Sequence, residues 1–260
     1  MNKAHIIALY DQDQRKDLVY PNMRREVTPT VVRHIDTSDI GEGTITYSQL
    51  HEANADDVIR EQVSYFESIG QDFEWKVYDY DTPPDLKERL ESHGFSVAEA
   101  EALVVLDVAE APEILYQPVR HHVQRIIIPE QLADVQTVEQ QVWGEDSSWV
   151  VDFLGDALNN YPEQMSVYVA YVDAQPASAA WTYFPENSQF ASLWGGATIS
   201  SFRKQGLYTS LLAVRVQEAK ARQVNYLTVD AMPMSRPILE RFGFEMIAFS
   251  YPCTWKCESQ

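Results

Sequence analysis

Residues 198–212 read TISSFRKQGLYTSLL, and this stretch decides how the rest of the sequence is interpreted. The run that leads into it (189–199) has the composition of a strand, and residues 207–222 carry apolar side chains at helical spacing. The stretch is therefore predicted to join a strand to the N-terminus of a helix. The first turn of a helix has backbone N–H groups without intrahelical partners. These groups and the helix dipole favour phosphate oxygens.

The residues of this loop suit an anionic ligand. Gly206 has no Cβ, so a ligand can approach its backbone closely. Arg203 and Lys204 add positive charge, and Thr209 adds a hydroxyl in the first helical turn. Three further cations are expected to extend a basic surface along the helix: Arg215, Lys220 and Arg222. A lone Arg-x-x-Gly is more often an ordinary turn, and it is the flanking strand and helix that favour the anion site. The P-loop and the G-x-G-x-x-G fingerprint are absent, which argues against nucleotide hydrolysis and dinucleotide binding.

The charge of the chain limits its partners. The 260 residues have a formal net charge of −19, and residues 1–118 alone carry 24 acidic and 10 basic side chains. Nucleic acid and anionic membranes both require a cationic surface, so neither is expected as a partner. The acidity is compatible with a cationic substrate, although acidic surfaces more often serve only solubility.

The lack of recognisable targeting signals and the small number of cysteines predict a cytoplasmic protein. No apolar run approaches the roughly 20 residues that span a bilayer, and the N-terminal residues lack the features of an export signal. Cys253 and Cys257 are too few for a disulfide framework and lack a second pair of zinc ligands. His121 and His122 are adjacent and point to opposite sides of an extended chain, so no metal site is expected there.

The second half of the chain has a regular pattern of elements. Strands are predicted at 123–128, 165–184 (two strands joined by a turn at 174–176), 189–199, 225–231 and 245–256, and helices at 129–143, 147–160, 207–222 and 235–244. The pair Gly195-Gly196 inside a strand indicates a bulge or a close approach of another backbone or ligand. The order predicts a mixed α/β fold in which an antiparallel meander leads into a parallel βαβ unit.

The first half shows a weaker version of the same pattern. Residues 1–53 are predicted to be irregular, followed by a helix at 54–70, a strand at 74–81, a helix at 82–95, a strand at 101–108 and a linker at 111–124. Residues 75–95 (WKVYDYDTPPDLKERLESHGF) and 226–244 (YLTVDAMPMSRPILERFGF) share a strand, a proline-bearing junction, a helix with Glu-Arg and a terminal Gly-Phe. The chain therefore looks like two copies of one unit, with the Arg-x-x-Gly loop only in the second.

At these residues the second half resembles the GNAT (N-acetyltransferase) superfamily. That family carries Arg/Gln-x-x-Gly-x-Gly/Ala between its fourth strand and third helix, and a later helix that ends in Gly-Phe, as at Gly243-Phe244. The matching loop residues are Arg203, Lys204, Gln205, Gly206, Leu207 and Tyr208. The resemblance implies a mixed sheet with a V-shaped splay, a GNAT acetyltransferase domain at 119–260 and a degenerate GNAT-like N-terminal domain at 1–118.

The resemblance also implies a ligand and a reaction. Acetyl-CoA is the expected co-substrate, with its pyrophosphate on the backbone of residues 203–209 and its pantetheine arm along the strand edge at Thr198-Ile199. An amine then attacks the acetyl carbonyl in the splay between strands 189–199 and 225–231, and a backbone N–H near the bulge polarises the carbonyl oxygen. The expected acceptor is a small-molecule or peptide amine. The first half is expected to close one side of the acceptor cleft or to form a homodimer contact.

Two residues depart from the family pattern. Tyr208 stands where the family has its second Gly or Ala, and Leu239 stands where many members have a Tyr that protonates the leaving thiolate. A leucine side chain cannot donate a proton. Asp230 and Ser235 are the candidate catalytic substitutes, but Asp230 at a strand end and Ser235 before a helix also suit helix capping.

An acceptor pocket is predicted on the strands beside the loop. Tyr183 and Trp194 lie on predicted strands and Glu186 in the turn after them, where the carboxylate would attract an amine. Aromatic residues on strands are more often part of a core. Two functions therefore stay open: an acetyl-CoA-dependent N-acetyltransferase, and a non-catalytic acyl-CoA-binding or regulatory protein. The loop favours the enzyme and Leu239 favours the alternative, whereas a purely structural domain leaves the basic loop unexplained.

Overall fold

The computed structural model describes residues 2–37, 41–144 and 146–257, and the chain divides into two compact units. Unit 1 consists of Met1–Val104, Asp230–Leu239 and Met246–Gln260, and unit 2 of Val105–Val229 and Glu240–Glu245. The sequence-predicted boundary near residue 118 lies inside unit 2. The C-terminal segment belongs with the N-terminal half because strand β12 (Glu245–Trp255) pairs with β4 (Phe73–Tyr78) over residues 250–255.

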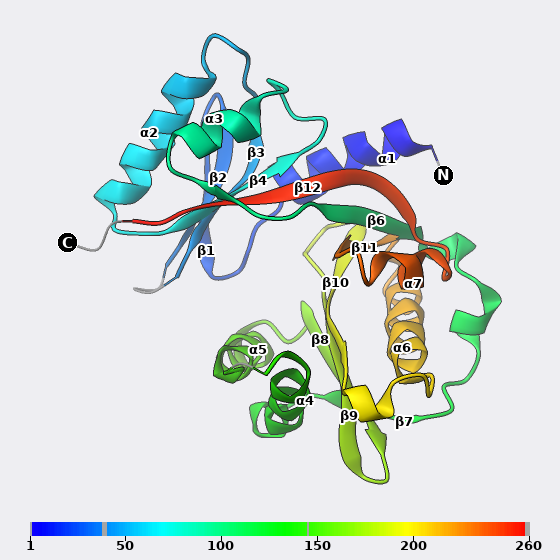
Figure 1. The fold of residues 1–260 in the computed structure, drawn as a ribbon. Helices are drawn as coiled ribbons and strands as arrows, with labels where there is room; N and C mark the ends of the chain where they lie inside the picture. Colours follow the sequence, from blue (N-terminus) through cyan, green and yellow to red (C-terminus); the bar gives the residue numbers. More distant parts are fainter. Residues whose placement is uncertain (1, 38–40, 145, 258–260) are drawn as a thin grey trace. The chain divides into compact units, whose positions relative to one another are not determined.

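Unit 1 contains a helix-covered sheet (Figure 1). Its first elements are α1 (Lys3–Tyr10), which continues into a π-helix (Asp11–Lys16), then β1 (Met23–Val27), β2 (Val31–Asp36) and β3 (Gly43–Ser48). They are followed by α2 (Ala55–Ser68), β4, α3 (Leu86–Ser92) and β5 (Ser96–Val97), and the later segments add most of α7 (Arg236–Glu240) and of β12. The strand order is β1-β2-β3-β4-β12, with β5 also paired to β12.

The core of unit 1 forms where α2 and α3 pack on this sheet. The apolar faces of the two helices, including Ile59, Phe66 and Leu90, join Ile45 and Trp75 of β3 and β4 in one buried cluster. Each of these side chains is fully buried. The helices are therefore stabilised mainly by burial of one apolar face.

Unit 2 contains the sequence-predicted loop. Its elements are β7 (His122–Ile126), α4 (Ala133–Trp143), α5 (Ser148–Asn160), β8 (Met165–Val172), β9 (Gln175–Tyr183), β10 (Phe190–Thr198), α6 (Leu207–Ala221) and the first part of β11 (Tyr226–Ala231). Short 3-10 turns lie at Val108–Glu110, Glu113–Tyr116, Pro129–Leu132 and Ser200–Phe202, and β6 (Glu101–Asp107) crosses from unit 1 into unit 2. The strand order within the unit is β11-β10-β9-β8-β7.

The helices of unit 2 cover opposite faces of its sheet (Figure 1). Ser166 and Tyr168 of β8 donate to Glu218 of α6 at 2.7 and 2.9 Å, so these two residues face α6. Tyr171, an odd number of residues further along, donates to Asp134 of α4 at 2.6 Å. Because side chains alternate across a strand, one face belongs to α6 and the other to α4 and α5.

Both units contain the same sequence of strand pairings. In unit 2, β8, β9 and β10 form an antiparallel meander with a register shift between Trp194 and Ala197, and β10 then pairs in parallel with β11 over residues 190–192 only. In unit 1, β1, β2 and β3 form the meander with a register shift at Val32/Arg33, and β3 pairs in parallel with β4 over residues 43–45 only. Each unit therefore has a mixed α/β sheet in which a parallel pair separates after three residues, which is the predicted splay.

The first 50 residues differ most from the prediction. They were expected to be irregular, and they form α1, the π-helix and three strands. The strands are inconspicuous because β1 is MRREV and because β2 buries Arg33 and His34 among its apolar residues. The β8–β9 turn also lies at Asp173-Ala174, with φ of 47° and 63°, rather than at residues 174–176. None of the helices in the described part of the chain combines the length and apolar character that crossing a membrane requires.

Candidate active site

The β10–α6 connection in unit 2 is built as a loop with free backbone donors. A 3-10 turn follows β10, Lys204 and Gly206 take left-handed backbone conformations (φ of 64° and 87°), and α6 begins at Leu207. The first intrahelical bond runs from Ser210 N–H to Gly206 C=O at 3.0 Å. No hydrogen-bond partner exists among the described residues for the N–H groups of residues 204–209, and no side chain caps the helix. These donors are available to an anion.

Two side chains of the loop bond to the loop backbone, and a third is exposed. Arg203 Nε donates to the carbonyl of Thr198 at 3.1 Å, and Gln205 Nε2 donates to that of Ser201 at 3.4 Å. Both bonds hold the loop in its own conformation. Lys204 is exposed, and the described residues offer it no ion pair, so its charge remains available. The first turn of α6 contains no acidic residue that would repel an anion.

The end of β10 is engaged on one side only. Ile199 N–H donates to Ala177 C=O at 3.0 Å, and the hydroxyls of Thr198 and Ser178 lie 2.7 Å apart, so both residues are tied to β9. The parallel pairing with β11 stops at Ser192, and no strand of the described chain pairs with the remainder of that edge. An extended ligand could therefore pair with β10 beyond Ser192 without displacing a strand.

Both glycines of the β10 bulge lie close to aromatic side chains. Gly195 has φ of 63°, and a Cβ there would lie 1.9 Å from Cζ3 of Trp181. A Cβ on Gly196 would lie 3.1 Å from Cε2 of Tyr208, so the Tyr208 ring packs against the bulge from the α6 side. The predicted bulge is confirmed, and the bulky Tyr208 is accommodated by the adjacent glycine. Burial raises the pKa of Tyr208, which keeps its phenol protonated at neutral pH.

His121 belongs to this loop, although the sequence placed it in a linker. Its Cε1 lies 3.3 Å from the point where a Cβ on Gly206 would be, and its Nδ1 lies 2.7 Å from Ser210 Oγ. The imidazole therefore contacts the start of α6. No sequence signal reveals this contact, because 85 residues separate His121 from Gly206. Within the described ranges, no group of three His, Cys, Asp or Glu side chains is arranged to hold a metal ion.

The prediction of a basic surface along α6 is wrong. Arg222 forms an ion pair with Glu218 at 2.8 Å, and Lys220 Nζ lies 4.2 Å from the centre of the Tyr116 ring. Arg215 is buried between α6 and the sheet with only 2% of its surface exposed. Amphipathic helices place long cationic side chains on either face, so charge alone does not predict exposure.

Two of the three predicted acceptor residues, Tyr183 and Trp194, lie on the α4–α5 face of the sheet, and Glu186 lies in the connection between β9 and β10. Ser192 pairs with Tyr183 and Trp194 with Trp181, and these positions alternate with those that face α6. Tyr183 is buried and its hydroxyl donates to Gln164 Oε1 at 3.3 Å, and Gln164 Nε2 donates to Glu186 at 3.1 Å. Trp194 is half exposed. Trp194 and Glu186 are thus exposed to a ligand, whereas Tyr183 is not.

A buried carboxyl on this face was missed from the sequence. Glu139 of α4 is 4% exposed, Trp143 Nε1 donates to its Oε2 at 2.9 Å, and its Oε1 has no partner in the described structure. Burial raises the pKa of Glu139 to about 7, against the lowering effect of the Trp143 bond. Further exposed aromatic side chains occur on the same two helices: Trp143, Trp149 and Phe153. A Glu at helical spacing in "QTVEQQVW" gives no sign that it points inward.

The candidate catalytic residues Asp230 and Ser235 lie in unit 1. Asp230 forms an ion pair with Lys76 at 2.6 Å and accepts from Ser250 Oγ at 3.2 Å. Ser235 Oγ donates to the carbonyl of Met232 at 3.1 Å, and Leu239 is buried with 1% exposed. Asp230 is therefore engaged by a cation, which favours a structural role over that of a free base.

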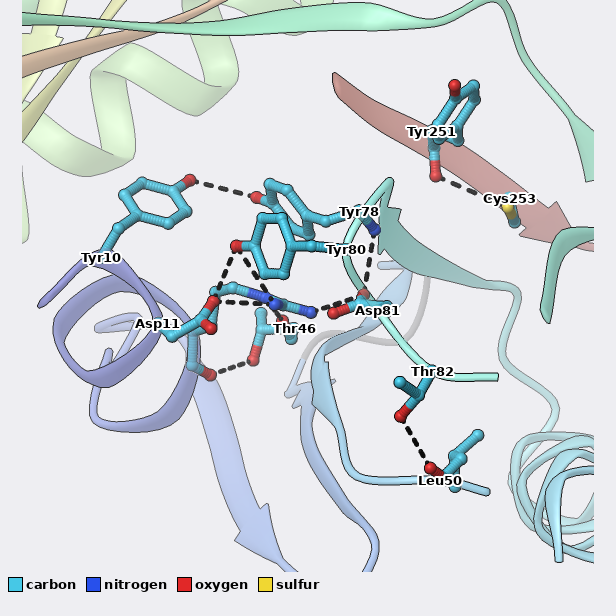
Figure 2. A network of polar contacts seen from close by, with 11 residues as sticks. Tyr10, Asp11, Thr46, Leu50, Tyr78, Tyr80, Asp81, Thr82, Tyr251 and Cys253 are labelled. Carbon is cyan, nitrogen blue, oxygen red and sulfur yellow. Dashed lines mark hydrogen bonds and ion pairs between the residues drawn. The ribbon is translucent and has the colours of Figure 1, made fainter. Parts of the chain in front are cut away.

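In unit 1 the bulge that corresponds to Gly195-Gly196 is used internally. Thr46 is the extra residue of β3 at the register shift, and Arg15 of the π-helix donates from Nε to its carbonyl at 2.9 Å. Arg15 also pairs with Asp81 and Asp11, each at 2.8 Å. Figure 2 shows Thr46, Tyr80, Asp81 and Asp11 gathered in this network. The π-helix thus supplies Arg15, whose side chain occupies the backbone carbonyl at the β3 bulge.

Known structures share this fold. A GCN5-related N-acetyltransferase from Kribbella flavida superimposes with a TM-score of 0.70 at 15% identity, covering 97% of this chain and 95% of that one. A tandem GNAT protein from the clavulanic acid biosynthesis pathway gives 0.59 at 12% identity (94% and 86%), and a GNAT-family acetyltransferase from Colwellia psychrerythraea gives 0.57 at 11% (92% and 84%). No known family profile matches the sequence, and no curated protein does. The chain has the fold of the GNAT N-acetyltransferases.

Proposed function

We propose that the protein is an acetyl-CoA-dependent N-acetyltransferase that acts on a small-molecule or peptide amine. The observation that carries the proposal is the row of unpartnered N–H groups at residues 204–209, which surrounds Gly206 at the start of a 15-residue helix. Backbone donors at a helix N-terminus suit a pyrophosphate. Exposed Lys204 adds a positive charge, and Gly206 leaves room for close approach.

The splayed edge of β10 supports the same ligand. Backbone groups beyond Ser192 are available to amide groups of the pantetheine arm, in the manner of an added strand. Bound there, acetyl-CoA supplies an activated thioester carbonyl. The chain's own contribution is to hold the arm along β10 and to direct a bulge N–H at the developing oxyanion. The amine is expected from the α4–α5 face, where Trp194 is exposed and the strands carry Tyr183.

The residues available for proton transfer favour an alternative function. Leu239 cannot protonate the leaving thiolate, and Asp230 is paired with Lys76. These two observations favour a second candidate, an acyl-CoA-binding regulatory protein that keeps the fold without turnover. Both candidates need the same loop. We place the protein in the cytoplasm, because two cysteines are too few for the disulfide framework typical of small secreted domains.

A binding and turnover experiment separates these functions. Acetyl-CoA is expected to raise the melting temperature of the wild type, and thiol release across a panel of amines reports transfer. Gly206→Glu should abolish the shift, because it places bulk and negative charge at the phosphate position. Gly70→Glu is the matched control, since Gly70 ends a helix with φ of 67° and nothing within 4 Å of a Cβ.

The outcomes decide between the candidates. Stabilisation with thiol release supports the enzyme, and stabilisation without release on any amine supports the regulator. If saturating acetyl-CoA leaves the melting temperature unchanged, both are wrong. If Gly206→Glu binds acetyl-CoA as well as Gly70→Glu does, the loop is not the pyrophosphate site.

A further inference from the structure

Arg215 is a buried cation without a counter-ion. It lies on α6, only 2% of its surface is exposed, and its one hydrogen bond within the described structure runs from Nε to Leu211 C=O at 3.0 Å. No carboxylate of the described residues forms an ion pair with it. Burial lowers the pKa of Arg215 to about 10, which still leaves it charged at neutral pH.

The chain pairs its other buried arginines. Arg15, 1% exposed, has Asp81 and Asp11, and Arg33, 8% exposed, has Glu26 at 2.7 Å. An unpaired buried charge destabilises a fold strongly, so its retention indicates a partner outside the polypeptide. The guanidinium is the side chain best suited to bind a carboxylate through two parallel hydrogen bonds.

The guanidinium lies toward the loop that starts α6. Helical side chains point toward the helix N-terminus, and the Nε bond to Leu211 confirms that direction one turn back. The phenols of Tyr208 and Tyr168 are the titratable groups that act on its charge. The Tyr208 ring in turn contacts exposed Gly196 of the bulge. Gly196 is exposed, Tyr208 is half-buried and Arg215 is buried, so these three residues lead inward from the β10 bulge.

We propose that Arg215 binds a carboxylate of the ligand at the β10 bulge, so that the protein prefers a dicarboxylic acyl thioester over an acetyl thioester. This assignment rests on the proposed function for the thioester itself. The reaction is balanced without another reactant: the amine nitrogen bonds to the carbonyl carbon, the carbon–sulfur bond breaks, and the amine proton ends on the thiol. A carboxylate on the acceptor amine is the second source of the same chemistry.

Ligand-dependent melting and titration calorimetry test the proposal with four probes: acetyl-CoA, succinyl-CoA, free succinate and inorganic phosphate. We expect the wild type to bind succinyl-CoA at least tenfold more tightly than acetyl-CoA, because two charge-assisted hydrogen bonds to the carboxylate add to the binding free energy. Arg215→Met should remove that preference and leave acetyl-CoA binding unchanged. Arg215→Lys should retain only part of it, and Lys220→Met, an exposed change on the same helix, should retain all of it.

A readout without any ligand supplements the titrations. If Arg215 is unpaired in the free protein, Arg215→Met should melt at a higher temperature than the wild type, because it removes a desolvated charge. Stabilisation by succinate that Arg215→Met loses, with no preference between thioesters, would assign the carboxylate to the acceptor. Failure of acetyl-CoA to bind at all refutes the proposed function, while the succinate and melting results still decide on Arg215.

Three results would overturn the assignment. Equal affinity of the wild type for both thioesters, with no response to succinate, excludes a carboxylate site. Stabilisation by phosphate equal to that by succinate contradicts the ligand class. A melting temperature of Arg215→Met below that of the wild type, with unchanged probe affinities, shows that the guanidinium serves the fold.

Discussion

Lys76 and Asp230 form a direct ion pair in unit 1, with 2.6 Å between Nζ and Oδ2 and about a fifth of each side chain exposed (20% and 17%). Burial acts to lower the pKa of Lys76, but the Asp230 carboxylate outweighs it, and the pKa lies well above its ordinary value. Asp230→Asn should therefore lower the free energy of unfolding by about 2 to 4 kcal/mol, because it leaves the lysine unpaired. Urea denaturation measures this change.

The control for this prediction is Asp57→Asn, which removes an exposed pair with Arg60 on α2 and should lower the free energy of unfolding by less than about 1 kcal/mol. Replacing both partners, as in Lys76→Met/Asp230→Leu, should recover much of the loss. An Asp230→Asn variant as stable as the wild type would show that the pair is not structural, and would return Asp230 to the list of candidate bases.

Glu139 should make stability depend on pH. Its folded pKa of about 7 lies above the ordinary value of 4.5, so the folded state holds the proton more tightly. The stabilisation is complete below pH 4.5 and is lost as pH rises through 7. Glu139→Gln should therefore gain about 3 kcal/mol relative to the wild type between pH 5 and pH 8. Unfolding by urea at both pH values gives the difference.

Two further variants test the origin of this pH dependence. Trp143→Phe should move the transition to higher pH, because the Trp143 hydrogen bond lowers the pKa of Glu139. Exposed Glu130→Gln should follow the wild type at both pH values. A Glu139→Gln curve parallel to that of the wild type would mean that the carboxyl is ionised in the folded protein.

The sequence predicted the parts of the fold that are encoded locally. The Arg-x-x-Gly loop, the Gly195-Gly196 bulge and the helices around them each depend on neighbouring residues, and all are present. What it missed depends on tertiary contacts. β2 buries Arg33 because the Arg33 guanidinium bonds to Glu26 and Gln62. Arg215 is buried, although it was expected on a basic surface along the helix. His121 reaches the loop only through the folded chain.

The two glycines of the β10 bulge should differ in their tolerance of alanine. Gly195→Ala requires φ of 63° and puts a methyl group 1.9 Å from Trp181, so it should cost about 2 to 4 kcal/mol through strain and overpacking. Gly196→Ala meets only Tyr208 at 3.1 Å and should cost less. Thermal denaturation of the pair measures the difference, and Trp181→Leu should partly rescue Gly195→Ala. Equal stability of the two variants would contradict the bulge geometry.

The Arg15 network should be the most sensitive site of unit 1. Arg15→Met leaves Asp81 buried without its cation and Thr46 C=O without its donor, so we expect a loss of about 3 to 5 kcal/mol. The control is Arg60→Met, whose exposed side chain pairs with Asp57 on the surface of α2. Urea denaturation compares the two, and a small loss in Arg15→Met would show that the bulge does not need to be filled.

Unit 1 repeats the strand pairings of unit 2, yet it should not bind a second acyl-CoA. Its bulge carbonyl is taken by Arg15, and the first turn of α2 carries Asp56 and Asp57, whereas the first turn of α6 has no acidic residue. Carboxylates at a helix N-terminus compete with an anion for the same dipole and repel it. Titration calorimetry with acetyl-CoA should therefore give one site per chain.

Gly206→Glu tells which unit holds that site. If the variant binds no acetyl-CoA, the single site is the β10–α6 loop. A stoichiometry of two, or binding that survives Gly206→Glu at full stoichiometry, would mean that the acidic turn of α2 does not exclude the cofactor. Asp56→Asn/Asp57→Asn in the Gly206→Glu background is the matching test. It should still bind nothing, because Arg15 continues to occupy the bulge of β3.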